Sequence, residues 1–356
     1  MPPVTVAADQ TTEEKLSPED IRKRTIMVIR ALRKEEKEKC ERSFEHFIKC
    51  AWNIIEPETP LTWNWHLTYL CNLAQSEIER IGRHEDKIWD IIIINIPPRS
   101  LKSWIFSRAA TAWAWIKFPW MRFMQGSYAD DLATEHAMEC RDIVQSDWYQ
   151  YNWGDRFQLK QDQNTKHHFR TDMNGARFTF STGSKTTGRG GNVVSWDDPL
   201  NPRQSESEKD IDTANKFWTR TLRNRINNKR VDVIWIIMQR LSPNDVTGHI
   251  LKTEKKKRIL HICLPAEERE WISPPELRQY YVNGLLFPGV FSKDFLEGEK
   301  SDAFYYSGQY LQNPTPEEGG MFKRKNWRYW QWPGMNLPPV IERVGDELFY
   351  CEVIDR

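Results

Sequence analysis

A lysine and a serine, Lys102 and Ser103, stand where a phosphate group could be bound. They follow an apolar run at residues 91–96 and a short segment at residues 97–101, and an alanine-rich stretch without glycine comes after them. A strand, a loop and a helix start in this order present backbone N–H groups to phosphate oxygens, and the helix dipole adds to the attraction. Lys102 would neutralise the β- and γ-phosphates of ATP, and the Ser103 hydroxyl would hold Mg²⁺.

The loop departs from the usual phosphate-binding pattern at its glycines. In G-x-x-x-x-G-K-[ST], the two glycine positions correspond to Ile96 and Leu101. Leu101 carries a Cβ where the backbone must pass close to phosphate, so we expect the loop to follow a somewhat different path. A solvated lysine beside a serine at a helix start is also common, so this pair alone decides little. The loop residues predicted to contact the nucleotide are Pro98, Arg99, Ser100, Leu101, Lys102 and Ser103.

Two acidic residues, Asp197 and Asp198, end a second apolar run at residues 193–196. An apolar strand that ends in paired acids is what a Mg²⁺-nucleotide site needs. Asp197 would reach the metal, and Asp198 would orient or deprotonate the attacking water. Alone, the pair also fits an Asp-Asp-Pro turn after an edge strand. Gln239 follows the apolar run at residues 231–238 and could sense the γ-phosphate, unless it only marks the exit from a buried strand.

Phosphoryl transfer usually needs an arginine against the developing charge. Arg99 lies inside the loop and could act within its own subunit. Arg189 is surrounded by glycines before the acidic pair, and it is our leading sensor or trans-acting finger. Arg156 and Arg170 are rivals, and a solvated surface position is the alternative for Arg156, Arg170 and Arg189.

The order of the predicted elements indicates the fold. Strands alternate with helices in a pattern that predicts an α/β fold with a central, mostly parallel, doubly wound sheet. Right-handed crossovers then place ligands at the carboxyl ends of the strands. The predicted strands cover residues 91–96, 122–127, 176–180, 193–196, 231–238 and 348–356, and the predicted helices cover residues 103–115, 131–144 and 206–225.

The ends of the chain differ from this core. Residues 1–16 are polar and without periodicity, so we expect a disordered tail. Ser17 and Pro18 have the character of an N-cap and first helical residue, and we expect one helix from there to Ile48 with one packed face. The predicted organisation is a helical, lid-like segment at 17–57, an ATPase core at 58–265 and a second subdomain or linker region, partly helical and irregular, at 266–345.

Composition excludes several classes. Lys and Arg number 51 against 50 Asp and Glu, so net charge gives no general attraction to nucleic acid or membrane. The six cysteines include no C-x-x-C and no tight His/Cys cluster, which argues against a disulfide framework or structural zinc and suits a reducing cytosol. The purely apolar runs, residues 91–94 among them, are far too short to span a bilayer.

From about residue 58 onward, the sequence resembles the large terminase subunit of tailed bacteriophages. The family's first motif usually reads PPRHGKS, and its second often has Glu where this chain has Asp198. Trp65 and His66 stand at the family's adenine-pocket segment, with His66 where a Gln is frequent. The similar segments are residues 96–103 (IPPRSLKS), 126–133 (GSYADDLA), 187–190 (TGRG) with 193–199 (VVSWDDP), 238–248 (MQRLSPNDVTG) and 310–322 (YLQNPTPEEGGMF).

The resemblance implies a Mg²⁺-dependent ATPase of the P-loop class that drives double-stranded DNA into a procapsid. Its partners would be the DNA, the portal protein and the small terminase subunit, and it would work as a homo-oligomeric ring in the cytoplasm of the infected host, docked on the procapsid. It also implies a carboxyl-terminal nuclease domain, of which residues 346–356 would be only the start. Two alternatives stay open: a non-catalytic portal-docking module that retains the fold, and another nucleic-acid translocase such as a helicase.

Overall fold

The computed structural model describes residues 17–184 and 188–315, together with the backbone of four short strands between residues 329 and 355. The predicted tail at residues 1–16 and the family-like stretch at residues 316–322 lie outside the described residues. Within the described part of the chain, no helix combines the length and apolar character that crossing a lipid bilayer requires.

An eight-stranded sheet forms the centre of the molecule, in the order β3-β4-β5-β2-β6-β7-β1-β8. The six strands from β5 to β8 in that order are parallel, and β3 and β4 are added antiparallel at one edge. The predicted α/β class with a mostly parallel sheet is therefore confirmed. The strands are β1 (Ile91–Asn95), β2 (Arg122–Ser127), β3 (Leu159–Asn164), β4 (His168–Thr171), β5 (Ala176–Ser181), β6 (Val193–Asp197), β7 (Val233–Met238) and β8 (Ile259–Cys263).

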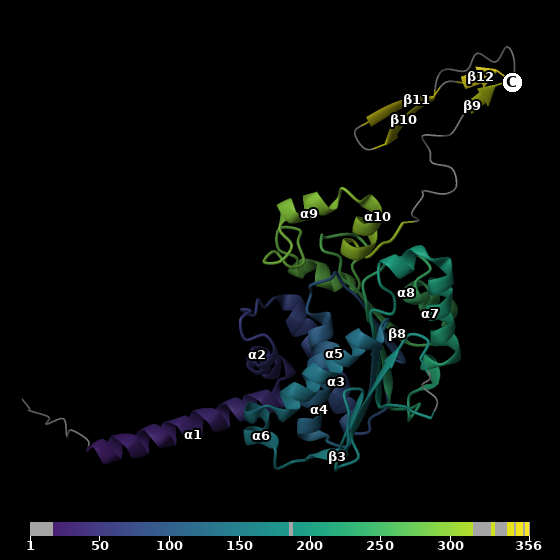
Figure 1. The fold of residues 1–356 in the computed structure, drawn as a ribbon. Coiled ribbons are helices and arrows are strands. Elements are labelled where there is room, and N and C mark those ends of the chain that lie inside the picture. Colours follow the sequence, from purple (N-terminus) through teal and green to yellow (C-terminus); the bar gives the residue numbers. More distant parts are fainter. Residues whose placement is uncertain are drawn as a thin grey trace, which may run out of the picture.

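Helices cover both faces of this sheet, as Figure 1 shows. Successive side chains of a strand point to opposite faces, so Ile92 and Ile94 enter one hydrophobic core while Ile91 and Ile93 enter the other. The first core is closed by α3 (Trp65–Gly82), α4 (Ala110–Lys117) and α5 (Asp130–Gln145), and α6 (Asp147–Trp153) extends it. The second is closed by α7 (Glu208–Arg220) and α8 (Val246–Thr253). A strand buried on both faces explains why β1 reads as an unbroken apolar run.

Two predicted core helices have a different form. The helix expected at residues 103–115 begins with a π-helical turn, Trp104–Ala109, and continues as α4 to Lys117. The helix expected at residues 206–225 is shorter, because Ser207 caps α7 through the backbone N–H of Asp210 and 3₁₀ turns flank it at Arg203–Glu206 and Leu222–Asn224. The predictions did not include α3, α6, α8 or the strands β3, β4 and β8.

The single amino-terminal helix that was predicted is two helices, α1 (Pro18–Arg42) and α2 (Phe44–Ile55). The Ser17 cap is confirmed, since its hydroxyl accepts from the backbone N–H of Asp20 at 3.1 Å. The expected packed face is wrong for the first half of α1: Ile21 and Leu32 are 52% and 59% exposed, and Figure 1 shows this helix projecting from the body. Burial begins at Cys40, where α1 reaches the other helices.

The segment after β8 is mainly short helices, and it packs into the first of the two cores, the one that Ile92 and Ile94 of β1 enter. Phe291, Leu296 and Tyr306 are buried in that core, and Figure 1 shows α9 and α10 above the body that contains the sheet. The elements are the 3₁₀ helix Pro275–Tyr280, α9 (Lys293–Glu299), α10 (Ala303–Tyr305) and the π turn Tyr306–Tyr310.

The strand expected at residues 348–356 is divided between two strands. β11 (Glu347–Cys351) pairs antiparallel with β10 (Val340–Val344), and β12 (Val353–Asp355) pairs parallel with β9 (Tyr329–Gln331).

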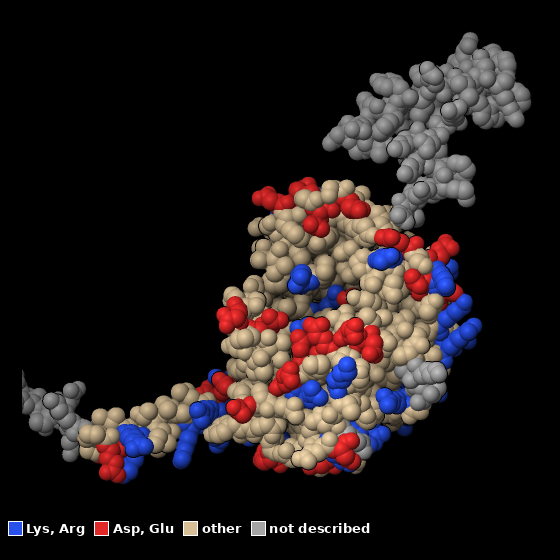
Figure 2. All heavy atoms as spheres, in the orientation of Figure 1, with Lys and Arg blue, Asp and Glu red and all other residues tan. Residues whose placement is uncertain are grey.

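Over the part of the surface that Figure 2 colours, acidic and basic side chains are interspersed, in keeping with the net charge of +1.

Candidate nucleotide site

The ends of three neighbouring parallel strands bring the predicted nucleotide residues together. In the register of the sheet, Asp197 of β6 lies beside Ile237 of β7, and Asn95 of β1 lies beside Met238 of the same strand. The loop after β1, the acidic pair after β6 and Gln239 after β7 therefore emerge side by side at one edge. This is the carboxyl edge, where open α/β sheets bind ligands.

The loop keeps a left-handed backbone although it has no glycine. Arg99 has φ 61° and Leu101 has φ 56°, values that glycine adopts freely and that cost other residues about 1–2 kcal/mol. Leu101 thus takes the conformation that glycine would supply in the usual pattern. Its half-buried side chain packs against the core beneath α4, which offsets part of this strain.

Lys102 forms an ion pair with Asp198. Its Nζ lies 3.1 Å from Oδ2, and the two side chains are only 7% and 20% exposed. The other carboxylate oxygen of Asp198 accepts from the backbone N–H of Gln239 at 3.3 Å, and Asp198 itself has φ 44°. A phosphate group that drew Lys102 away from Asp198 would leave that carboxylate free to accept a proton or to orient water.

Asp197 offers a buried oxygen that fits a metal ion. Its side chain is 1% exposed, and Oδ2 accepts from the hydroxyl of Ser107 at 2.8 Å. Its Oδ1 is buried and has no hydrogen-bond partner among the described residues. Burial raises the pKa of both Asp197 and Asp198, and the positive charge of the Lys102 ammonium partly opposes this rise. The Ser103 hydroxyl also lowers the pKa of Asp197. A hard cation between Asp197 and Ser103 would satisfy the unpartnered oxygen.

Several polar side chains behind Asp197 were missed by the sequence reasoning. Arg177 donates to the backbone oxygen of Ser107 at 2.9 Å, and Gln125 donates to that of Phe106 at 2.6 Å, so both hold the π turn after the loop. Burial lowers the pKa of Arg177 to about 10. Polar residues inside the apolar strands β2 and β5 were the signal available in the sequence.

His136 of α5 also faces the acidic pair. Its Nδ1 lies 3.9 Å from Oδ2 of Asp197, and its side chain is 5% exposed. Burial lowers the pKa of His136 to about 3, so the ring is neutral at pH 7 and adds no positive charge to the site. Nothing in the sequence around His136 distinguishes it from a core residue of an amphipathic helix.

Gln239 and Arg240 leave β7 in different directions. Gln239 is 8% exposed, and its Oε1 is buried without a hydrogen-bond partner in the described part of the chain. Arg240 forms an ion pair with Asp245 at 2.9 Å, and its backbone N–H donates to Oε1 of Gln312 at 2.9 Å. Gln239 is therefore next to the acidic pair, while Arg240 joins the strand to the segment after β8.

Trp65 and His66 lie in different surroundings at the start of α3. The Trp65 ring lies 5.4 Å from the Tyr280 ring and lines an open cavity of about 530 Å³ with Tyr69, Asn72 and other side chains. His66 is fully buried, with its ring 4.9 Å from that of Phe287, and burial lowers its pKa to about 3. Its ring adjoins the main chain of Ser100, so the start of α3 lies beside the loop.

The predicted arginines are not gathered at the acidic pair. Arg99 is exposed, and the Arg189 guanidinium lies 5.4 Å from the centre of the Phe178 ring of β5. Arg156 pairs with Glu41 at 2.6 Å and so serves to hold α1, and Arg170 lies on β4. Among the described residues, no hydrogen bond or ion pair joins Arg189 to Lys102 or to the acidic pair.

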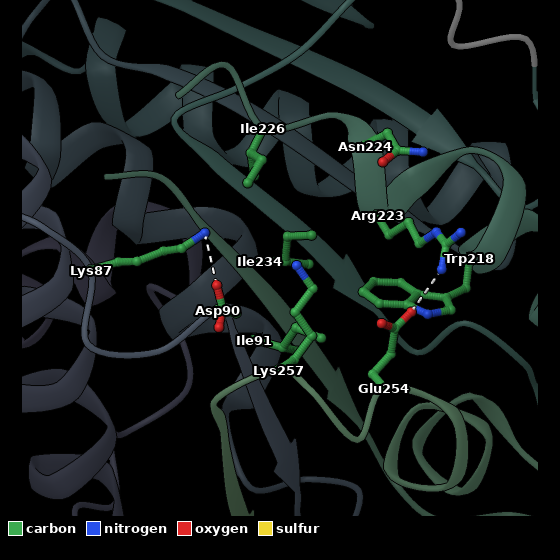
Figure 3. A pocket seen from close by; sticks show the side chains of 10 residues that line it. All are labelled: Lys87, Asp90, Ile91, Trp218, Arg223, Asn224, Ile226, Ile234, Glu254 and Lys257. Atoms are coloured by element: carbon green, nitrogen blue, oxygen red, sulfur yellow. Dashed lines mark hydrogen bonds and ion pairs between the residues drawn. The ribbon is translucent and has the colours of Figure 1, made fainter. Parts of the chain in front are cut away.

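A cavity of about 220 Å³ lies at the opposite edge of the sheet (Figure 3). It is lined by residues at the beginnings of β1 and β7, among others Ile91 and Ile234. Four of its charged groups form two ion pairs, Lys87 with Asp90 and Arg223 with Glu254, each at 3.1 Å, and Lys257 also lines it. The cavity lies where the strands begin, whereas open α/β sheets bind ligands where the strands end.

Comparisons with known proteins give structural similarity only. No protein-family model matches the sequence, and a search of curated proteins gives no match. The large terminase of bacteriophage HK97 is similar in structure with a TM-score of 0.44 and 11% identity, over 74% of this chain and 55% of that chain. The large terminase of a thermophilic bacteriophage, in complex with ADP, has a TM-score of 0.38 and 13% identity, over 67% and 52%. The complex of that terminase with ATP-γ-S has a TM-score of 0.35 and 13% identity, over 66% and 51%. The chain thus spans about half the length of the large terminase chains that it resembles.

Proposed function

We propose that this chain is the ATPase portion of a phage DNA-packaging terminase, which hydrolyses ATP to move double-stranded DNA into a procapsid. The observation that carries the proposal is the ion pair of Lys102 with Asp198 beside the buried Asp197, at the carboxyl edge of a parallel sheet. The terminase-like segments, in order along some 260 residues, support the packaging role. The portal protein, the small subunit and further copies of this chain would be its partners.

The residues divide the work as follows. Lys102 leaves Asp198 to bind the β- and γ-phosphates, and the freed carboxylate orients and deprotonates the attacking water. Asp197 and Ser103 would hold Mg²⁺, which when bound neutralises charge that develops on the phosphate oxygens. Ser107 keeps the Asp197 carboxylate in place through its 2.8 Å hydrogen bond. An arginine from a neighbouring subunit, Arg189, would complete the site.

The test is Mg²⁺-dependent ATP hydrolysis by the wild-type chain, measured with double-stranded DNA at high protein concentration so that neighbouring copies can meet. Lys102→Ala and Asp197→Asn should abolish turnover, and Lys255→Ala, which removes an exposed lysine far from the loop, should not. Asp198→Asn should slow hydrolysis by about 10²–10⁴-fold while ATP binding stays at least as tight, because Lys102 is released.

Two results would overturn parts of the proposal. If wild type hydrolyses ATP no faster than Lys102→Ala, the catalytic assignment fails, and ATP binding without turnover would favour the non-catalytic docking module. If hydrolysis is present but the chain cannot displace a triplex-forming strand from duplex DNA in the presence of procapsids, the translocation role fails while the ATPase stands.

A further inference from the structure

Two cysteines and a histidine meet where α1 and α2 join. One ligand atom from each of Cys40, His46 and Cys50 lies within 4.8 Å of the other two. The sequence reasoning did not identify this cluster, because the spacing of the three residues matches no familiar zinc motif. We propose that they bind a zinc ion that fixes the joint between the two helices.

The fold brings the three side chains together through one turn. Ser43 has an extended backbone, with φ −133° and ψ 115°, and it both ends α1 and caps α2 through the backbone N–H of His46. The chain therefore doubles back, and Cys40 in the last turn of α1 faces α2. His46 and Cys50 are four residues apart on α2 and so lie on one face of that helix.

The surroundings hold this geometry. The backbone oxygen of Cys40 accepts from the indole N–H of Trp113 at 2.9 Å, and Phe44 packs on the same indole with ring centroids 5.2 Å apart. Cys40 is fully buried, and His46 and Cys50 are half-buried at the rim. These contacts fix the position of Cys40 whether or not an ion is bound.

The donor set suits zinc. Thiolate and imidazole are the ligands that Zn²⁺ prefers, in a tetrahedral arrangement. Two thiolates balance the charge of the ion, so the bound group is formally neutral and loses little solvation energy at a buried position. Nε2 of His46 is shielded from solvent and has no hydrogen-bond partner within the described residues, so the ring has a nitrogen to offer.

Solvent can supply the fourth ligand. A shallow hollow beside His46 is lined by Lys39, Arg42, Glu45 and Lys49, among others, and it opens the site to water on that side. The ion would thus be held by three protein ligands and one water molecule.

The consequence concerns the direction of α1. The first half of this helix projects from the body with its apolar residues exposed, and Cys40 lies in its last turn. An ion shared between Cys40 and α2 would set the angle at which α1 leaves the body.

The experiment uses the full chain, expressed with added zinc and purified under reducing conditions without chelator. Metal content is measured by plasma mass spectrometry, and Co²⁺ is then substituted to look for thiolate-to-cobalt charge-transfer absorption. The variants are His46→Ala and Cys50→Ser. Their matched controls are His84→Ala, at an exposed histidine, and Cys71→Ser, at a buried cysteine outside the cluster.

We expect about one zinc ion per chain in wild type and in both controls, and loss of the ion and of the cobalt band in His46→Ala and Cys50→Ser. EDTA should lower the thermal midpoint of wild type and leave that of His46→Ala unchanged. The proposal is overturned if wild type binds neither zinc nor cobalt, or if the two variants retain as much metal as wild type. A Cys40–Cys50 disulfide with no bound metal would also overturn it. None of these readouts depends on ATP hydrolysis.

Discussion

Leu101 carries the backbone conformation on which the nucleotide loop depends, and its strain can be measured. Leu101→Gly and Leu101→Ala both remove the half-buried side chain, so the lost packing is common to the two variants. They differ in the left-handed backbone at φ 56°, which costs alanine about 1–2 kcal/mol and costs glycine nothing. Glycine also makes the unfolded chain more flexible, which lowers the free energy of the unfolded state by about 0.5–1 kcal/mol. Leu101→Gly should therefore be the more stable of the two by about 0.5–1 kcal/mol.

A matched pair at an ordinary helical position gives the opposite sign. Glu135 is exposed in the middle of α5, where glycine is about 1 kcal/mol less favourable than alanine. The measurement is urea unfolding of all four variants, compared by free energy of unfolding and denaturant slope. Glu135→Gly should be less stable than Glu135→Ala, whereas Leu101→Gly should be more stable than Leu101→Ala.

The reasoning about the loop is refuted if the two positions behave alike. A Leu101→Ala variant that is more stable than Leu101→Gly by about 1 kcal/mol would mean that residue 101 has an ordinary backbone in solution. A changed denaturant slope in only one variant would point to the unfolded state instead, and nucleotide-induced stabilisation of the same variants would then separate the two explanations.

Four further outcomes follow from the structure. Burial raises the pKa of Asp197 and Asp198, so Mg²⁺ must displace protons from them at acid pH. The affinity for Mg²⁺-ATP, measured by calorimetry, should therefore rise with pH through the range above about 4 and then level off. An affinity that does not change with pH would contradict the assignment. Ser107→Ala should raise the Mg²⁺ concentration needed for half-maximal hydrolysis by roughly 10–100-fold, with metal-free nucleotide binding unchanged. Arg156→Ala should lower thermal stability by about 1 kcal/mol without changing turnover. Arg189→Ala should leave thermal stability unchanged and lower ATP turnover by roughly 10³-fold. If Arg156→Ala and Arg189→Ala change thermal stability and turnover equally, Arg189 is not the trans-acting arginine.

The buried strands and the chemistry at their ends could be predicted because both are local in the sequence. An apolar run such as residues 91–96 has few alternatives to a buried strand, and Lys102 and Asp197 directly follow such runs. Lys102 follows β1 and Asp198 follows β6, and these two strands flank β7, so both residues lie at the same edge of the sheet.

What the sequence did not predict depends on contacts between distant segments. The break at Ser43 needs no glycine or proline, because a serine that caps both helices suffices. The roles of Gln125 and Arg177 depend on the π turn at Trp104–Ala109, and the sequence of that turn gives no signal of a π conformation. Cys40, His46 and Cys50 become a cluster only after the chain reverses.

The geometry beyond β7 indicates how occupancy of the loop could reach the rest of the chain. Asp198 accepts from the backbone of Gln239, and the next residue, Arg240, donates its backbone N–H to Gln312 at 2.9 Å. Gly308 packs so closely on Arg240 that a Cβ there would lie 2.7 Å from the backbone oxygen. A shift of Asp198 when Lys102 changes partner would therefore move the backbone of Gln239 and Arg240, which is in close contact with Gly308 on its other side. We expect Gly308→Ala to disturb this exit, and it should alter ATP turnover while leaving the residues that contact the nucleotide unchanged; normal turnover in a folded Gly308→Ala variant would show that the segment after β8 is not coupled to the loop.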